Sequence, residues 1–333
     1  MKYNVAVVGA TGMVGRKMLQ VLSERNLPID NLYLFASSKS AGKKVDFMGK
    51  TYTVIELTEE SVKSHKVDIA LFSAGAGTSK TFAPIFAECG ATVIDNSSQW
   101  RTAPEIPLVV PEVNPEDIAW NHGIIANPNC STIQAVVALA PLHKVFGIKR
   151  IVYSTYQAVS GAGLGGYTDL EEGIKGNPPK KFPKPIFGNC LPHIDVFLDD
   201  GYTKEEQKMM FETRKILHDQ SLKITATTVR VPVYYGHSES VNVEFNKPVT
   251  LEAVKKVLSE AEGVIVMDDP KNGVYPTALE CADHDEVYVG RIRLDKSVDS
   301  GVNLWIVADN IRKGAATNAV QIAERLIAMK EGK

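Results

Sequence analysis

A glycine-rich turn directly after the first apolar run is the strongest constraint that this sequence places on its fold. Residues 3–9 read YNVAVVG, and Gly9, Gly12 and Gly15 then recur at three-residue spacing where an amphipathic stretch begins. Glycines permit a sharp turn and let backbone N–H groups at a helix N-terminus approach a pyrophosphate closely. The pattern of strand, turn and helix therefore predicts dinucleotide binding. A tight turn with only a structural role is the alternative.

The rest of the chain predicts two domains, in keeping with its 333 residues. Up to residue 129, near-continuous apolar strands alternate with helical stretches, which is typical of a Rossmann-type parallel sheet covered on both faces. From about residue 150, longer strands with two-residue alternation predict an α+β domain with a mixed sheet. We expect one domain over 1–129, completed by a C-terminal helix 312–333, and a second over 130–311.

Composition excludes several classes of protein. The 37 basic and 39 acidic side chains give a net charge of -2, so no broad basic field suggests binding to nucleic acid or to an anionic membrane. The four cysteines form no CxxC pair, which argues against a disulfide framework and a metal site. No apolar run approaches the 18 or so residues of a membrane span, and the first residues do not resemble a signal peptide. We therefore expect a cytoplasmic protein.

The segment after the second predicted strand indicates which dinucleotide is bound. In NAD-binding domains an acidic residue about 20 residues after the glycine turn accepts the ribose hydroxyls. Here residues 35–44 read FASSKSAGKK, and the first acid is Asp46. A carboxylate would repel a 2'-phosphate, whereas hydroxyls and a lysine bind it. We therefore predict NADP, with Ser37, Lys39 and Ser40 as candidate phosphate contacts.

Cys130 stands at the predicted start of an apolar helix, within the run NPNCST. Asn129 is a candidate N-cap, which would place Cys130 in the first turn, where unpaired N–H groups and the helix dipole stabilise an anion. A thiolate in that position would be a competent nucleophile. A buried structural cysteine is the alternative and, for an isolated cysteine, the commoner case.

Further polar residues in the second half strengthen the interpretation of Cys130 as a nucleophile. Gln157 ends a predicted strand just before a second glycine-containing turn. Arg230 and His237 lie seven residues apart around a proline and a glycine. A guanidinium suits a carboxylate, and histidine suits proton transfer. Each signal is weak alone, since a single histidine is more often structural.

Several motifs together resemble the bacterial aspartate-β-semialdehyde dehydrogenases, which are NADP-dependent. In chain order they are GATGMVG, SSKSAG, DNSSQWR, VVPEVN, NPNCSTIQ, STYQAVSGAG, RVPV with GHSESV, and DNIRKGAATNAVQIAE. They extend from residue 9 to residue 324. The resemblance implies reduction of β-aspartyl phosphate to aspartate semialdehyde in the pathway to lysine (through diaminopimelate), methionine and threonine.

The resemblance also implies a role for each matching residue. Cys130 would attack the acyl phosphate to form a thioester, His237 would be the acid/base and Gln157 would orient the acyl group. Arg230 would bind the substrate carboxylate and Glu205 its ammonium group. The implied phosphate ligands are Arg101, Asn129 and Lys208. The implied cofactor contacts are Gly9, Thr11, Gly12, Met13, Val14, Lys39 and Ser40, with Ser160, Gly161 and Asn310 on the nicotinamide side.

Two of these assignments have simpler alternatives. Glu205 and Lys208 lie three residues apart on a predicted helix, which is the spacing of an ordinary surface ion pair. Asn310 could be a turn residue before the final helix. The resemblance further implies a homodimer assembled through the second domain, with a tetramer as the alternative.

Two other functions compete with this one. The first is N-acetyl-γ-glutamyl-phosphate reductase, which shares the architecture; its cysteine stands between glycine and tyrosine, whereas Asn129 and Ser131 flank Cys130. The second is a catalytically silent NADP-binding protein. Loss of the nucleophile or the base would be its signature, yet Cys130 and His237 are both present.

Overall fold

The computed structural model describes residues 1–332 and divides into two compact units. The first unit is Met1–Pro128 with Ala315–Lys333, and the second is Asn129–Gly314. Lys333, the last residue of the predicted C-terminal helix, lies outside the described residues. No helix in the described part of the chain is long and apolar enough to cross a membrane.

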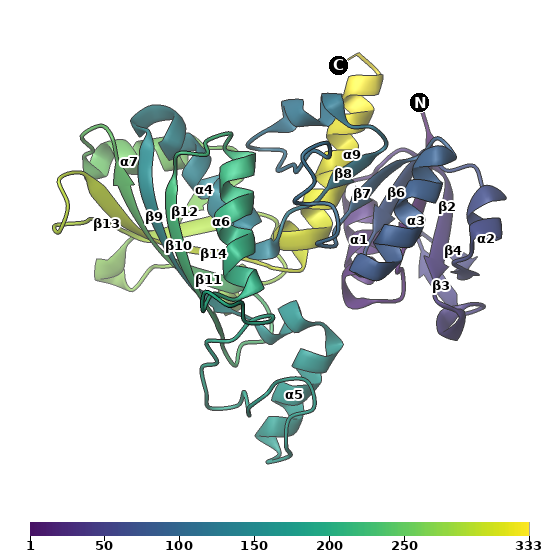
Figure 1. The fold of residues 1–333 in the computed structure, drawn as a ribbon, viewed down its shortest axis with the longest axis horizontal. Helices are drawn as coiled ribbons and strands as arrows, with labels where there is room; N and C mark the ends of the chain where they lie inside the picture. The colour runs from purple at the N-terminus through teal and green to yellow at the C-terminus, as the bar shows by residue number, and fades with distance from the viewer. Residues whose placement is uncertain (333) are drawn as a thin grey trace. The chain divides into compact units, whose positions relative to one another are not determined.

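The first unit is built on a six-stranded, wholly parallel sheet, as predicted (Figure 1). The strand order is β5-β2-β1-β6-β7-β8. A separate hairpin joins β3 and β4. The strands are β1 (Tyr3–Val8), β2 (Ile29–Ala36), β3 (Lys44–Phe47), β4 (Lys50–Thr53), β5 (Ile55–Glu56), β6 (Ile69–Phe72), β7 (Thr92–Asp95) and β8 (Ile124–Ala126).

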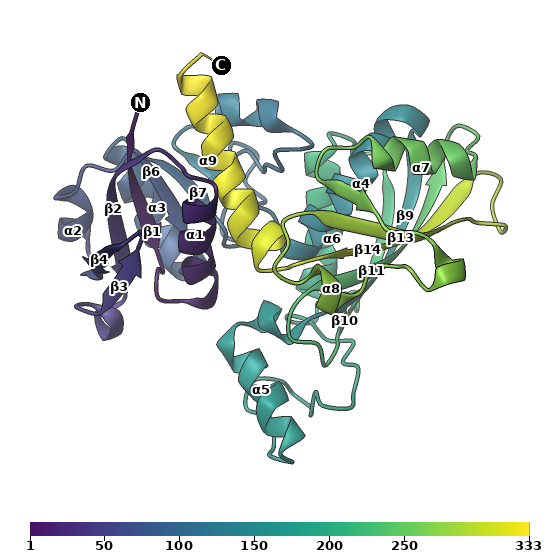
Figure 2. The ribbon, with the colours of Figure 1, turned by 180° about the vertical axis from the view of Figure 1, so that it is seen from behind.

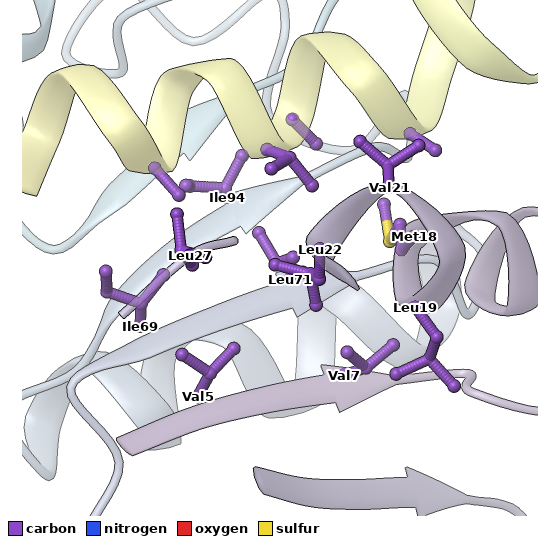
Figure 3. Packing of buried hydrophobic residues seen from close by; sticks show 14 of the residues in the cluster. Val5, Val7, Met18, Leu19, Val21, Leu22, Leu27, Ile69, Leu71 and Ile94 are labelled. Atoms are coloured by element: carbon purple, nitrogen blue, oxygen red, sulfur yellow. The ribbon is translucent and has the colours of Figure 1, made fainter. Parts of the chain in front are cut away.

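Helices cover both faces of this sheet, because its central strands carry apolar side chains on both sides. On one face α1 (Met13–Glu24) and α9 (Thr317–Lys330) pack on the sheet and on each other, and Figure 3 shows Val21 of α1 pointing toward α9. On the other face α3 (Ala76–Glu88) contacts β6, β7 and β8, and its Phe86 stacks edge-to-face on Phe72. The remaining helical segments are α2 (Glu59–Lys63), η1 (Ser38–Ser40) and η2 (Pro115–Trp120).

The C-terminal helical segment opens with a π-helical turn. Residues Arg312–Ala316 form a π-helical turn, η5, and the regular α-helix starts at Thr317. Asp309 initiates this segment, because its Oδ1 accepts hydrogen bonds from the backbone N–H groups of Ile311 (2.7 Å) and Arg312 (3.0 Å). The start of α9 is thus set by the wide turn that precedes it.

The second unit contains the predicted mixed sheet, in the order β10-β9-β11-β14-β13-β12 (Figures 1 and 2). The pairs β10–β9 and β12–β13 are parallel and the other neighbours are antiparallel. The strands are β9 (Ile148–Gln157), β10 (Lys223–Arg230), β11 (His237–Phe245), β12 (Val264–Val266), β13 (Val287–Leu294) and β14 (Gly301–Ala308).

Three helices pack on one face of this sheet. The long α4 (Cys130–Phe146) contacts β9, β11, β13 and β14, while α6 (Lys204–Ile216) contacts β10 and α7 (Leu251–Ser259) contacts β12 and β13. On β11 the residues alternate accordingly between buried and half-buried from Glu239 onward. The other elements are α5 (Leu164–Ile174), α8 (Ala278–Cys281), η3 (Val159–Ala162) and η4 (Pro270–Asn272).

The buried face of β11 carries an unusual acid, Glu239. Its side chain is fully buried, and neither carboxyl oxygen has a hydrogen-bond partner in the structure. Its neighbours across the sheet are Thr155 on β9 and Ile306 on β14. Burial raises the pKa of Glu239 well above 4.5, because the charged form would lose its hydration without compensation.

We expect Glu239→Gln to stabilise the protein increasingly as pH rises. The folded state retains a proton that the unfolded chain releases above about pH 4.5, so the contribution of Glu239 to stability falls as pH rises toward its folded-state pKa. The loss is up to about 1.4 kcal/mol per pH unit in that range. Glutamine does not titrate and avoids this loss.

Denaturant unfolding at pH 5, 6.5 and 8 measures the effect. The unfolding free energy of the variant minus that of the parent should grow with pH. Glu244→Gln, on the half-exposed face of the same strand, is the matched control for the change in charge. A difference between Glu239→Gln and parent that stays constant across this pH range would contradict the prediction.

Candidate active site

The N-terminus of α4 is capped by Asn129, which confirms the predicted N-cap. Its Oδ1 accepts hydrogen bonds from the backbone N–H groups of Ser131 (3.0 Å) and Thr132 (3.4 Å). Cys130 is the first residue of the helix and is partly exposed. The thiol therefore lies at the positive end of a 17-residue helix, where an anionic sulfur is favoured.

Gly314 fixes the position of Cys130 from the other side. A Cβ added at Gly314 would lie 2.8 Å from the Cβ of Cys130, closer than carbon atoms approach without displacement. Only glycine fits there without moving the cysteine. The sequence analysis did not single out Gly314, although it stands inside the motif DNIRKGAA.

The backbone of one residue, Ala158, orients both His237 and Arg230. The backbone N–H of Ala158 donates to Nδ1 of His237 (3.0 Å), and its carbonyl oxygen accepts from Nη1 of Arg230 (2.7 Å). Since Nδ1 of His237 accepts a hydrogen bond, the ring proton lies on Nε2. Nε2 of His237 and Nε of Arg230 are buried and have no hydrogen-bond partner in the structure.

The histidine is neutral in this environment. Burial, followed by the nearby charge of Arg230, lowers the pKa of His237 to about 3, against the opposing effect of Glu205. Burial also lowers the pKa of Arg230, while Glu205 and Cys130 act electrostatically to raise it. In the second unit, electrostatic interactions thus link Arg230 to Cys130, Glu205 and His237, and link Glu205 to His237.

Gly161 leaves space at this cluster. A Cβ on Gly161 would lie 2.8 Å from Nη1 of Arg230 and 3.2 Å from Nε2 of His237. Any larger residue would crowd the two side chains from which we expect proton donation and substrate binding. The turn that the resemblance implied as a cofactor contact therefore also limits the space beside Arg230 and His237.

Glu205 on α6 is the centre of a buried hydrogen-bond network. Its Oε1 accepts from Nδ2 of Asn129 (2.9 Å) and Nε2 of Gln157 (3.1 Å), and its Oε2 accepts from Nζ of Lys208 (3.1 Å). Burial opposes ionisation, but the charge of Lys208 and these three hydrogen bonds outweigh it and lower the pKa of Glu205 to about 2. The side chain is 5% exposed, so this is not an ordinary surface ion pair.

Sequence reasoning missed two acids in this network. Asp195 accepts a second hydrogen bond from Nζ of Lys208, at 2.7 Å. Glu212, in the last turns of α6, accepts a hydrogen bond from the backbone N–H of Asn129, at 2.7 Å. Glu205 and Glu212 lie seven residues apart, which places them on the same face of a helix. This spacing was the signal in the sequence that could have identified Glu212.

Asn310, Ser160 and Gly236 connect three segments near this cluster. Oδ1 of Asn310 accepts from the backbone N–H of Gly236 (3.0 Å), and its Nδ2 donates to Oγ of Ser160 (3.1 Å). Asn310 and Ser160 are both buried. Asn310 thus lies in the turn before the C-terminal helical segment, as the alternative held, and its side chain also joins two other chain segments.

In the first unit, the glycine turn packs closely against neighbouring backbone and leads into a helix end that no side chain caps. Gly9 has φ +85°, and a Cβ there would lie 2.4 Å from the carbonyl oxygen of Ser73. A Cβ on Gly15 would lie 2.2 Å from the carbonyl oxygen of Gly9. Gly12 is the N-cap of α1, and no side chain caps this helix end. The first-turn N–H groups, which include those of Met13 and Val14, therefore suit a phosphate.

The predicted 2'-phosphate contacts come directly after β2. This strand pairs with β1, the strand that leads into the glycine turn. Ser37 and Lys39 are exposed, and Oγ1 of Thr11 donates to Oγ of Ser40 (3.3 Å). Residues 37–40 carry three hydroxyls and a cation and contain no acid. Its chemistry fits a phosphate group on the ribose.

Arg101, also in the first unit, is a buried guanidinium. Its Nε donates to the carbonyl oxygen of Asn127 (2.9 Å), and its Nη2 donates to that of Asn96 (2.9 Å). These bonds fix the side chain against the segments that follow β7 and β8. Its predicted role as a phosphate ligand stays a prediction.

Comparison with known proteins identifies both halves of the chain. A family model described as the semialdehyde dehydrogenase NAD binding domain matches residues 4–121, and one described as the dimerisation domain matches residues 139–313. An aspartate-semialdehyde dehydrogenase of Aquifex aeolicus is 58% identical, over 100% of this chain and 99% of its own length.

Solved structures give the same result. An aspartate semialdehyde dehydrogenase II from Vibrio cholerae, complexed with ASA, has a TM-score of 0.94 and 50% identity, covering 98% of both chains. The enzyme from Candida albicans with NADP has a TM-score of 0.78 and 28% identity, covering 99% of both chains. On this basis the chain belongs to the aspartate-semialdehyde dehydrogenase family.

Proposed function

We propose that this chain reduces β-aspartyl phosphate to aspartate semialdehyde with NADPH, and catalyses the reverse, phosphate-dependent oxidation of the aldehyde. The observation that carries this proposal is Cys130 at the capped N-terminus of α4, in one cluster with His237, Arg230 and Glu205. A thiolate, a hydrogen-bond donor and a carboxylate-binding cation are the groups that acyl-phosphate reduction needs.

Cys130 acts as the nucleophile. Its sulfur attacks the acyl carbon of the substrate, the tetrahedral intermediate expels phosphate, and a thioester remains on the enzyme. A thioester accepts hydride where a free carboxylate would not. The bound NADPH supplies that hydride. The resulting hemithioacetal expels the thiolate and releases the aldehyde, so the cysteine is regenerated unchanged.

His237 stabilises the charge that develops on the acyl oxygen. Its neutral ring carries the proton on Nε2, the buried nitrogen that has no protein partner. A donor held in this way is ready to bind an oxyanion without rearrangement. As negative charge builds up on the acyl oxygen, the hydrogen bond from Nε2–H to that oxygen strengthens. The neutral ring keeps its proton, because losing it would leave an imidazolate, and the hemithioacetal oxyanion expels the thiolate directly to give the aldehyde.

The two ends of the substrate are bound by different groups. We assign the substrate carboxylate to Arg230, because Nε of its guanidinium has no partner in the protein. We assign the ammonium group to Glu205, whose pKa of about 2 keeps it ionised, and the acyl group to Gln157. The proposed phosphate ligands are Arg101, Asn129 and Lys208.

We assign NADP to the domain predicted over 1–129 with 312–333, and catalysis to 130–311. The glycine turn would hold the pyrophosphate through backbone N–H groups, and Lys39 with its neighbouring serines would select the 2'-phosphate. Ser160, Gly161 and Asn310 are proposed for the nicotinamide side. The four free cysteines are consistent with a reducing, cytoplasmic location.

A homodimer follows from the dimerisation domain matched over 139–313. The sheet of the second unit offers a surface for it, because the face opposite α4 is only partly covered. The rings of Tyr156 and Trp305 lie there as a tilted pair with their centroids 5.5 Å apart, and Tyr156 is 39% exposed. We propose that a second copy of the chain covers this face.

Phosphate-dependent reduction of NADP by aspartate semialdehyde tests the proposed activity. We expect turnover that requires phosphate and is at least about 100-fold faster than with N-acetylglutamate semialdehyde, because Glu205 offers an anion to a free ammonium group. Absorbance of NADPH reports the rate. Activity on the acetylated aldehyde alone would support the reductase alternative and refute this assignment.

Cys130→Ser should lower kcat by about three orders of magnitude or more, because a hydroxyl is a far weaker nucleophile and no thioester forms. The affinity for NADPH, measured by fluorescence titration, should stay within about twofold of the parent. Cys190→Ser, at an exposed cysteine, is the control and should leave kcat unchanged. Substantial turnover by Cys130→Ser would remove this cysteine from the mechanism.

NADPH should bind at least about tenfold more tightly than NADH, since Lys39 would pair with the 2'-phosphate. Lys39→Ala should weaken NADPH binding and leave NADH binding nearly unchanged. The matched control is Lys43→Ala, at an exposed lysine four residues further along the same segment. Calorimetric titration of both cofactors measures the preference, and equal or tighter binding of NADH by the parent would refute it.

A further inference from the structure

Asn129, the residue that caps the nucleophile helix, is bound at both ends by α6. Its side-chain Nδ2 donates to Glu205 (2.9 Å), and its backbone N–H donates to Oε2 of Glu212 (2.7 Å). Its remaining amide oxygen caps α4. Both glutamates are buried, and Glu212 is 1% exposed. Two carboxylates of one helix therefore determine where the first turn of α4 begins.

The spacing of these acids along α6 explains how they share one partner. Seven residues correspond to almost two helical turns, so Glu205 and Glu212 lie on the same face of α6, about 10 Å apart along its axis. That face packs against α4. The side chain and the backbone of Asn129 fill the gap between the two carboxylates.

We propose that Glu212 is a positioning residue that sets the location of the Cys130 sulfur by accepting the hydrogen bond of the Asn129 backbone. The inference rests on the proposed function, in which Cys130 is the nucleophile. Glu205 and Lys208 of the same helix are the proposed ligands of the substrate. Consequently α6 fixes the distance between the bound substrate and the attacking atom, and Glu212 is its anchor on the nucleophile side.

The contact needs an acceptor oxygen at a defined reach and does not need a charge. Glu212→Gln keeps an acceptor oxygen at the same reach and removes the charge. Glu212→Asp keeps the charge but withdraws the oxygen by about one carbon–carbon bond, too far for a 2.7 Å hydrogen bond. The two variants therefore separate the geometry of the hydrogen bond from the electrostatics of the carboxylate.

We expect Glu212→Gln to keep kcat within about threefold of the parent. Glu212→Asp should lower kcat by about 10- to 100-fold, the effect of a misplaced reacting group, with KM changed by less than about threefold. Alkylation of Cys130 by iodoacetamide at pH 7.5, with the modified cysteine mapped by peptide mass, should slow in Glu212→Asp and stay near the parent rate in Glu212→Gln. Gln207→Ala, on the exposed side of α6, should match the parent.

Two results would overturn the proposal. The first is a Glu212→Gln variant with a lowered kcat and a parent-like affinity for NADPH, and the second is a Glu212→Asp variant with the kcat of the parent. If Glu212→Asp does not fold, Glu212→Gln still tests the proposal. A Glu212→Gln variant with lowered kcat and slowed alkylation contradicts it, and one that keeps both rates supports it. Inactivity of the parent on aspartate semialdehyde would refute the proposed function alone. The alkylation rates would still report on the position of Cys130.

Discussion

The catalytic unit depends on how the N-terminus of α4 is held. The Asn129 side chain occupies the cap, so the first-turn N–H groups of Ser131 and Thr132 are satisfied and the sulfur of Cys130 meets the positive end of the helix dipole. Gly314 allows the chain to press against Cys130 from another side. These contacts hold the backbone at Cys130 before any substrate binds, and under the proposed function this limits the ordering required in the transition state.

In the same unit, two nitrogen atoms of His237 and Arg230 are buried without hydrogen-bond partners. This lowers the stability of the free protein and leaves two donors available to an anionic ligand. The backbone N–H and carbonyl oxygen of Ala158 each satisfy one nitrogen, Nδ1 of His237 and Nη1 of Arg230, and leave Nε2 and Nε without partners. A buried donor without a partner is destabilising in the free protein. The same donor gains a strong interaction when an anionic ligand arrives, so the unsatisfied atoms mark where the substrate is expected to bind.

Several elements followed from local patterns and were confirmed. The glycine turn, the cap at Asn129 and the parallel and mixed sheets depend on short-range rules of backbone conformation and side-chain alternation. Glu205 and Lys208 show the limit of such rules, because three-residue spacing on a helix is the same for an exposed pair and a buried one. Only packing against Asn129 and Gln157 makes this pair part of a buried network.

The sequence by itself determined which chemistry is available: a glycine-rich phosphate loop without a following acid, one cysteine at a helix start, and an arginine and a histidine in a short polar segment. The tertiary structure decided how those groups are held. The ring proton of His237, the near contact of Gly314 with Cys130 and the anchor at Glu212 all come from residues distant in the chain. Burial and long-range hydrogen bonds produce these effects, and they depend on folding that no local pattern of residues contains.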